Sequence, residues 1–179
     1  VTEPKEIFSD IKNHWAKDII EKLAEKKMVS GYPDGSFKPD SNITRAEFVS
    51  MAIKCFADVS DTEYDGSFLD VSNSDWYAKY ISKALNMGII SKDVYFRPND
   101  NITREEICKI AVCLSGCEQS GGLLEYADSG SISEWAVPYV KAASENKIVN
   151  GYEDNTFRGG SFATRAEAAV ILDRVKNLK

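Results

Sequence analysis

The chain contains 179 residues, of which 43% are hydrophobic and 28% are charged. This balance fits one domain, or a few small ones, with a packed core and a soluble surface. The formal net charge of −6 argues against a protein that binds duplex nucleic acid, because such a protein presents a basic face. No apolar run approaches the roughly 18–20 residues that a membrane-spanning helix needs.

Residues 1–6 have the composition of a linker, and the sequence shows no signal peptide, so we interpret the chain as a mature or excised piece. A single histidine, and four cysteines that form no Cys-x-x-Cys pair, argue against a structural zinc site. We expect the cysteines to be buried free thiols, with a disulfide as the alternative. They are Cys55, Cys108, Cys113 and Cys117.

Internal repetition is the main feature of the sequence. The stretches "NITRAEF", "NITREEI" and "FATRAEA" begin at residues 42, 101 and 162. Their threonines are separated by 59 and 61 residues, and the three tryptophans of the chain by 61 and 59. The chain therefore consists of three units, which we delimit as residues 1–58, 59–118 and 119–179.

The first unit is predicted to be two helices joined by a turn. Apolar residues recur at helical spacing from Trp15, which opens the pattern, to Ala24. The stretch "GYPDGSFKP" at residues 31–39 is rich in helix breakers and contains the turn signal Asp-Gly. A second helical pattern begins at the repeated motif and continues to Cys55.

The second and third units follow the same plan. Their first helices are expected near residues 80–88 and 135–143, with Pro138 in the first turn of the latter, where a missing N–H costs little. The turn of the third unit, "GYEDNTFRG", matches that of the first, whereas the turn at residues 90–98 is shorter and lacks the Gly-Tyr pair. The repeated motif again starts the second helix of each unit.

A lone unit of about 60 residues buries little core and would be marginally stable. We therefore expect an all-α fold in which three helix–turn–helix repeats form a pseudo-threefold trimer around a central three-helix bundle. The helices that begin at the repeated motif would build this bundle. A straight solenoid is the alternative arrangement.

The repeated motif contains a capping box, Thr-x-x-Glu, before each apolar run. In such a box the threonine hydroxyl accepts a hydrogen bond from the backbone amide three residues later, and the glutamate accepts one from the threonine amide. The three pairs are Thr44–Glu47, Thr103–Glu106 and Thr164–Glu167. Helix capping explains the threonine and the glutamate, but it does not explain the arginine between them.

Each box carries an arginine at the first helical position, namely Arg45, Arg104 and Arg165. The N-terminus of a helix already carries positive partial charge, so a cation there is locally unfavourable. Three arginines beside free helix amides in an acidic protein instead indicate three anion-binding sites. On this reasoning, replacing Arg45 with alanine would leave the melting temperature nearly unchanged or slightly raised.

This combination of motifs resembles the S-layer homology module, in three tandem copies over essentially the whole chain. The matching stretches are Phe-Ser-Asp at 8–10, His-Trp-Ala at 14–16, "GYPDGSFKP", "GYEDNTF" and the three Thr-Arg-[Ala/Glu]-Glu boxes. The resemblance implies a pseudo-trimer with a central three-helix bundle. It also implies an extracellular, non-enzymatic module that anchors exported and S-layer proteins to the bacterial cell wall without covalent bonds.

The resemblance further implies a ligand, a peptidoglycan-linked secondary cell-wall polysaccharide that commonly ends in pyruvylated N-acetylmannosamine. In the family, the sites lie in grooves between modules, and the box arginine meets the carboxylate of the pyruvate ketal. A tryptophan face can stack on the sugar, although core packing is the alternative for tryptophan. Carried over by position, the carbohydrate-binding residues are Arg45, Arg104, Arg165, Trp15, Trp76, Trp135, Asp10, Asp70, Asp128, Gly31 and Gly151. We expect a monomer with no cofactor, metal or nucleic-acid partner.

The second and third units depart from the family pattern. The second lacks the Gly-Tyr pair, and Glu105 places a negative charge beside Arg104; the third has Arg-Gly at 158–159 in place of base-Pro. We therefore expect the site built with the turn of the second unit to be the weakest. Accordingly, Arg104→Ala should weaken binding less than the more damaging of Arg45→Ala and Arg165→Ala.

Three other functions compete with wall anchoring. An enzyme has little support, because the chain shows no nucleophile paired with a base and because one active site needs no threefold copy, although a pair of glycosidase carboxylates remains open. A calcium module is disfavoured, because no twelve-residue loop with glycine at position six and an acid at twelve is present. A purely structural helical repeat, or a protein–protein interaction module without carbohydrate binding, is the remaining alternative.

Overall fold

The computed structural model describes residues 7–179, and the linker expected at residues 1–6 lies outside this part. Within it, the regular elements are helices, and extended backbone pairs only as isolated bridges, so the expected all-α class is confirmed. No helix among these residues is long and apolar enough to cross a membrane. The elements are α1 (Lys17–Glu25), α2 (Arg45–Phe56), α3 (Ala78–Asn86), α4 (Arg104–Ser115), the 3-10 turn η1 (Ser129–Ser131), α5 (Val137–Glu145) and α6 (Arg165–Asn177).

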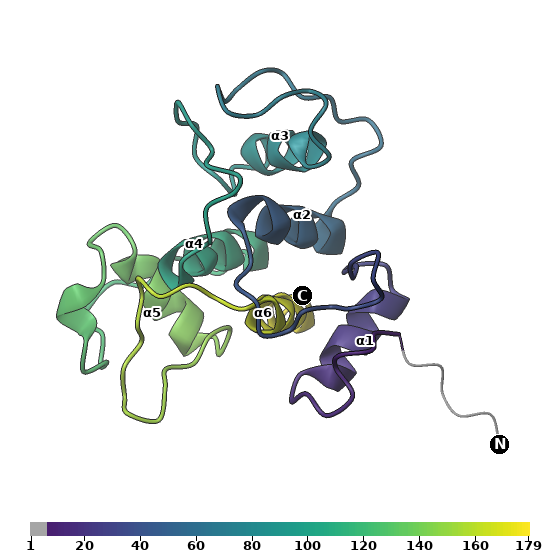
Figure 1. The fold of residues 1–179 in the computed structure, drawn as a ribbon. Helices are drawn as coiled ribbons and strands as arrows, with labels where there is room; N and C mark the ends of the chain where they lie inside the picture. Colours follow the sequence, from purple (N-terminus) through teal and green to yellow (C-terminus); the bar gives the residue numbers. More distant parts are fainter. Residues whose placement is uncertain (1–6) are drawn as a thin grey trace.

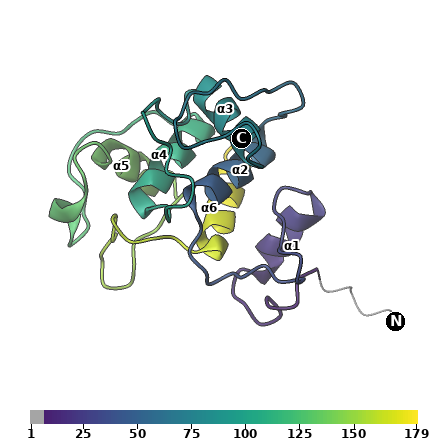
Figure 2. The ribbon, with the colours of Figure 1, turned by 45° about the horizontal axis from the view of Figure 1, so that its top comes forward.

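The helices that begin at the repeated motif, α2, α4 and α6, lie together in the middle of the molecule, and α1, α3 and α5 lie outside them (Figure 1). Each outer helix packs on the inner helix of a neighbouring repeat: α3 on α2, α5 on α4, and α1 on α6. The turned view in Figure 2 shows the same inner group. Contact between the first and last helices closes the chain, as expected for a threefold arrangement and not for a straight solenoid.

A closed cycle of backbone hydrogen bonds joins the three repeats where the inner helices start. The amide of Ile43 donates to the carbonyl of Ala163 at 3.0 Å, Ala163 donates to Ile102 at 3.2 Å, and Ile102 donates to Ile43 at 3.0 Å. All three residues are fully buried. Because a buried amide without a partner is costly, each repeat depends on the next to satisfy its backbone.

All three capping boxes form as predicted. In the first, Thr44 Oγ1 accepts from the amide of Glu47 at 3.2 Å, and Glu47 Oε2 accepts from the amide of Thr44 at 3.0 Å. The outer helices have no such side-chain cap. They begin two residues after each tryptophan, so the prediction that Trp15 opens a helix is wrong by two residues. Pro138 lies in the first turn of α5, as expected.

The four cysteines are free thiols, but only two of them are buried. Burial raises the pKa of Cys55 to about 11 and that of Cys108 to about 12. Cys113 is exposed and Cys117 is half-buried, so the expectation of burial is wrong for these two. The reason is helix geometry, because Cys113 lies on the face of α4 that points away from the central bundle.

Burial should set the order in which the thiols react. The thiolate is the reactive species and must be accessible, so we expect iodoacetamide to modify the exposed Cys113 and the half-buried Cys117 first in the folded protein. Cys55 and Cys108 should stay unmodified until the protein unfolds. Peptide mass spectrometry with and without denaturant would measure this. Rapid modification of Cys108 without denaturant would contradict the packing of α4 described above.

Loss of one capping box should have a modest effect on stability. We expect Thr44→Ala to lower the free energy of unfolding by about 1 kcal/mol, because the amide of Glu47 loses its acceptor. Thr44→Ser, which keeps a hydroxyl acceptor, is the matched control and should lie within a few tenths of a kcal/mol of the wild type. Urea denaturation followed by circular dichroism would test both. Equal stability of the alanine and serine variants would show that the cap contributes nothing.

Candidate functional site

The aspartate of each unit folds the turn instead of facing a groove. The carboxylate of Asp10 accepts hydrogen bonds from the backbone amides of Phe37 and Lys38 at 2.8 and 2.7 Å. Lys38 has a left-handed backbone with φ of 56°, which this carboxylate helps to hold. The equivalent contacts join Asp70 to residues 96–97 and Asp128 to residues 157–158. These aspartates therefore support the turns on which the grooves are built.

The glycines of the first and third turns are required by close packing. A Cβ atom on Gly31 would lie 2.4 Å from the ring of Phe8 and 2.5 Å from the carbonyl oxygen of Ser36. A Cβ atom on Gly151 would lie 2.5 Å from the ring of Tyr126. Both glycines also line a groove. The close approach of the backbone at these glycines is made to the aromatic ring that precedes each aspartate.

The N-termini of the inner helices are closed to anions. The amide of Arg45 donates to the carbonyl of Asp100 at 2.9 Å, and the amide of Ala46 donates to that of Pro98 at 3.1 Å. The same contacts tie α4 to the carbonyls of Ser161 and Gly159, and α6 to those of Ser41 and Pro39. The prediction of free helix amides is therefore wrong, because a neighbouring repeat supplies carbonyl acceptors for the first two amides of each helix.

The box arginine reaches into the turn of another repeat, and Arg165 shows the arrangement. Its Nε donates to the carbonyl of Phe37 at 2.8 Å, and its Nη2 donates to that of Ser30 at 3.1 Å. Its Nη1 pairs with the capping-box carboxylate of Glu47 at 3.2 Å, and its guanidinium lies 4.8 Å from the ring centre of Tyr32. Arg104 makes the equivalent contacts with Phe157, Asn150 and Glu167.

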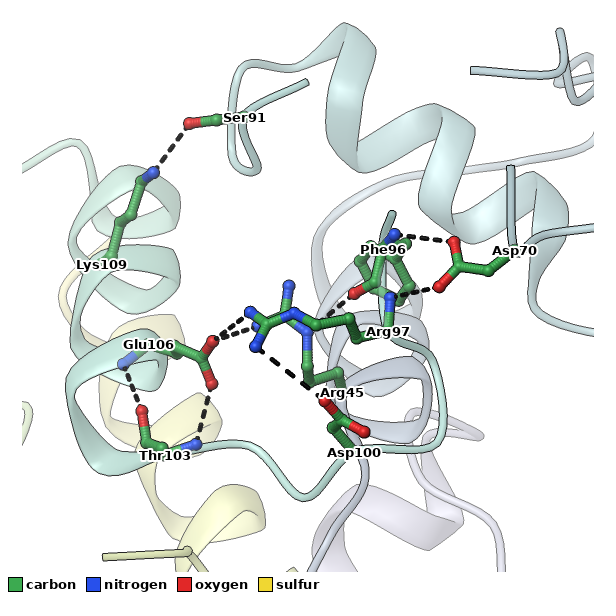
Figure 3. A network of polar contacts seen from close by, with 9 residues as sticks. All are labelled: Arg45, Asp70, Ser91, Phe96, Arg97, Asp100, Thr103, Glu106 and Lys109. Atoms are coloured by element: carbon green, nitrogen blue, oxygen red, sulfur yellow. Dashed lines mark hydrogen bonds and ion pairs between the residues drawn. The ribbon is translucent and has the colours of Figure 1, made fainter. Parts of the chain in front are cut away.

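Arg45 makes fewer contacts than the other two. Its Nε donates to the carbonyl of Phe96 at 2.9 Å, and its Nη1 donates to Glu106 at 2.5 Å (Figure 3). Its Nη2 makes no hydrogen bond with the residues that the structure describes. The side chain is 15% exposed, against 8% for Arg104 and 5% for Arg165. Glu106 also accepts from Arg97 at 3.1 Å, so two arginines share this carboxylate.

Three grooves lie beside these arginines, and we name grooves I, II and III after the repeat that contributes the turn. Their volumes are about 190, 340 and 170 Å³. Each groove is lined by the turn and inner helix of one repeat, by the box arginine of a second and by the tryptophan of the third. These pairs are Arg165 and Trp76 in groove I, Arg45 and Trp135 in groove II, and Arg104 and Trp15 in groove III.

The tryptophans are at the surface. Trp15, Trp76 and Trp135 are 65%, 58% and 47% exposed, so the alternative of core packing is wrong for all three. An exposed indole at the edge of a groove can stack on an apolar ring face. The structure therefore brings the predicted arginines, tryptophans and turn glycines to three grooves, and places the aspartates behind the turns.

The sequence does not show which box arginine lines the groove formed by each turn. The turn of the second repeat meets Arg45, whereas Arg104 belongs to groove III. Glu105 does not line that groove; it is buried, and its Oε1 accepts from the amide of Ser133 at 2.9 Å. A Cβ atom on Gly159 would lie 2.5 Å from the same oxygen, so glycine there makes room for Glu105. Neither reason for expecting a weak site at Arg104 therefore holds.

The arginine contacts change the expected effect of their removal on stability. Arg165→Ala deprives Glu47 of its cation and leaves two carbonyl oxygens unpaired, so we expect a loss of about 3 kcal/mol in the free energy of unfolding. Arg45→Ala should cost less, about 1–2 kcal/mol, because Glu106 keeps Arg97. Urea denaturation measures both. If both variants were as stable as the wild type, the sequence-based expectation that removing a box arginine does not destabilise the protein would hold instead.

Comparison with known proteins identifies the family. The chain matches the S-layer homology domain over residues 7–49, 67–108 and 125–169, with one match in each repeat. It is 43% identical over 171 residues to the exoglucanase XynX of Acetivibrio thermocellus and to an amylopullulanase of Thermoanaerobacterium thermosulfurigenes. Each alignment covers 92% of this chain, but 16% and 9% of these relatives.

A cellulosome-anchoring protein of Acetivibrio thermocellus is 33% identical over 154 residues, which are 82% of this chain and 33% of that protein. The chain thus spans a third or less of the length of these relatives. The three domain matches cover most of its residues and coincide with the three repeats that form the grooves. The chain therefore belongs to the S-layer homology family, as three tandem domains of an extracellular protein associated with the cell surface.

Proposed function

We propose that the chain anchors a larger protein to the bacterial cell wall, without covalent bonds, by binding a pyruvylated secondary cell-wall polysaccharide in its grooves. The observation that supports this most directly is the pairing, in every groove, of a largely buried guanidinium with an exposed indole. A sugar that bears a carboxylate needs both groups. The guanidinium fork matches the carboxylate, and the indole face matches the C–H face of the ring.

Each box arginine is already paired within the protein, but its guanidinium keeps N–H donors that can bind such a ligand. A guanidinium has about five N–H donors, and Arg165 uses three of them, on Phe37, Ser30 and Glu47. The capping-box glutamate holds the guanidinium in place, and the remaining N–H groups can bind a ligand carboxylate. Because the side chain is fixed by its neighbours, little side-chain entropy is lost when the ligand binds.

We propose a binding module and not an enzyme. Three similar grooves are more useful to an anchor, which gains strength from several weak contacts, than to a catalyst with one active site. The relatives that are named as enzymes match this chain over 16% and 9% of their length, and we assign hydrolytic activity to the rest of such proteins. A structural or protein-interaction module without sugar binding is the alternative that the following experiment separates.

Binding to isolated walls tests the function. We expect the chain to sediment with peptidoglycan sacks that carry pyruvylated polysaccharide, and not with sacks from which the polysaccharide has been stripped. A third preparation, in which mild acid has removed the pyruvate ketal, should bind much less, because the arginines lose their carboxylate partner. Equal sedimentation with all three preparations would refute the proposal and favour the protein-interaction alternative.

Single tryptophan replacements test the grooves. Trp76→Ala should weaken binding of a pyruvylated saccharide in groove I by about tenfold, as expected for the loss of one good aromatic contact. Its fold should be preserved, because the side chain is 58% exposed. Leu69→Ala, in the same repeat and 76% exposed, is the matched control and should bind as the wild type does. Calorimetry measures both, and identical affinities of the two variants would remove Trp76 from the site.

A further inference from the structure

Groove II has a different set of charges from grooves I and III. We propose that it is a second kind of site, which binds a glycan carrying two neighbouring acidic groups, the second being a phosphate or a carboxylate. This inference rests on the proposed function for the first acidic group, which Arg45 would hold. It adds a second, separate point of recognition that the other two grooves lack.

The cations of groove II outnumber those of its counterparts. Four basic and two acidic side chains line groove II, whereas two basic and one acidic side chain line each of the others. Groove II is also the largest of the three, at about 340 Å³. Its shorter turn lacks the Gly-Tyr pair that lines grooves I and III. The four basic residues are Arg45, Lys92, Arg97 and Lys109.

Lys109 marks the difference between the grooves most clearly. It lies six residues after the box threonine, where α2 has Ser50 and α6 has Val170. All three residues line their grooves, so the same position offers a cation, a hydroxyl and an apolar group. In grooves I and III the inner helix instead supplies its cation four residues later, from Lys54 and Arg174. The cation of α4 is therefore about 6 Å, roughly one helical turn, closer to the helix start, where Glu106 pairs with Arg45.

The positive charge of groove II is incompletely compensated within the protein (Figure 3). Lys109 Nζ donates to the hydroxyl of Ser91 at 2.8 Å, which is a neutral partner. Arg45 and Arg97 share the single carboxylate of Glu106, and the carboxylate of Asp100 lies 3.9 Å from Arg97 at the exposed rim. In grooves I and III, by contrast, the box arginine has a capping-box glutamate that no second arginine shares.

These contacts define the chemistry of the ligand. The unbonded Nη2 of Arg45 can bind one acidic group, and Lys109, which lines the same groove three residues after Glu106 on α4, can bind another. An ammonium group is a compact point charge that suits a phosphate or a carboxylate equally well. Trp135 can stack on the sugar that joins the two acidic groups. A glycan with one acidic group would leave Lys109 without an anionic partner.

The three tryptophans allow each groove to be observed separately. Each groove contains one, so the three indole N–H signals in a ¹⁵N–¹H spectrum report on grooves I, II and III, and single Trp→Phe variants assign them. Three probes are needed, all built on pyruvylated N-acetylmannosamine. They are the methyl glycoside of this sugar, the 1-phosphate of this sugar, and the disaccharide in which this sugar is linked to a glucuronic acid. The first has one acidic group; the other two add a phosphate or a carboxylate.

We expect the signal of Trp135 to show at least tenfold tighter binding of a two-acid probe than of the methyl glycoside, with less than threefold preference at Trp15 and Trp76. Lys109→Val, which copies α6, and Lys109→Ser, which copies α2, should reduce this preference at groove II to less than threefold. Lys83→Val, which removes a half-buried lysine that lines none of the grooves, should retain it. Whichever two-acid probe shows the larger preference identifies the second group as phosphate or carboxylate.

Two results would overturn the inference. Either the preference for two-acid probes is equal in all three grooves, or it persists at Trp135 in both Lys109 variants. If the methyl glycoside and both two-acid probes shift no indole signal, the proposed function fails together with this inference. If the methyl glycoside binds but the two-acid probes bind no better at groove II, only the inference about groove II fails.

Discussion

The fold depends on an ion pair that is repeated around a ring, between the box arginine of one repeat and the capping-box glutamate of the next. The pairs are Arg45–Glu106, Arg104–Glu167 and Arg165–Glu47. Each glutamate uses one oxygen to cap its own helix and the other to hold an arginine from elsewhere. Capping and closure are therefore linked, because a repeat that is displaced from the ring loses the partner that orients its own cap.

This linkage explains why a cation is tolerated at the positive end of a helix. Isolated, Arg165 at the start of α6 would be unfavourable, but the first two amides of α6 donate to carbonyls of the first repeat. The guanidinium extends away from them to Glu47 and to two further carbonyls. The local cost is thus offset by contacts with another repeat. This is a tertiary effect, which helix propensity does not include.

Much of the fold could be predicted from the sequence, because its determinants are local. The Thr-x-x-Glu boxes specify helix starts within four residues, and apolar periodicity specifies which faces are buried. The arginines and tryptophans of the grooves were found because their spacing repeats. The roles of Asp10 and Gly31 were harder to infer. Asp10 accepts hydrogen bonds from two turn amides, and Gly31 packs against an aromatic ring, and both sets of partners lie about 20–30 residues away in the sequence.

The pairing of grooves with arginines could not be predicted, because it depends on how the ring closes. Sequence order suggests that Arg104 lines a groove together with the turn of its own repeat. In the structure, Arg45 lines the groove formed by that turn, and Arg104 lines the groove formed by the turn of the third repeat. The same closure also explains Gly159, which looks like a departure from the family pattern. Its missing side chain accommodates Glu105 of another repeat, so two apparent irregularities of the sequence form one contact.

A groove assembled from three repeats places a particular condition on the chain. Removal of the third repeat would take Arg165 from groove I and Trp135 from groove II, and would abolish groove III altogether. No groove is therefore complete in a shorter chain. Because the three repeats are covalently joined and not identical copies, however, each wall can change independently. Ser50, Lys109 and Val170 occupy one position in three chemical forms, so a single fold that must close as a unit can still present three different binding surfaces.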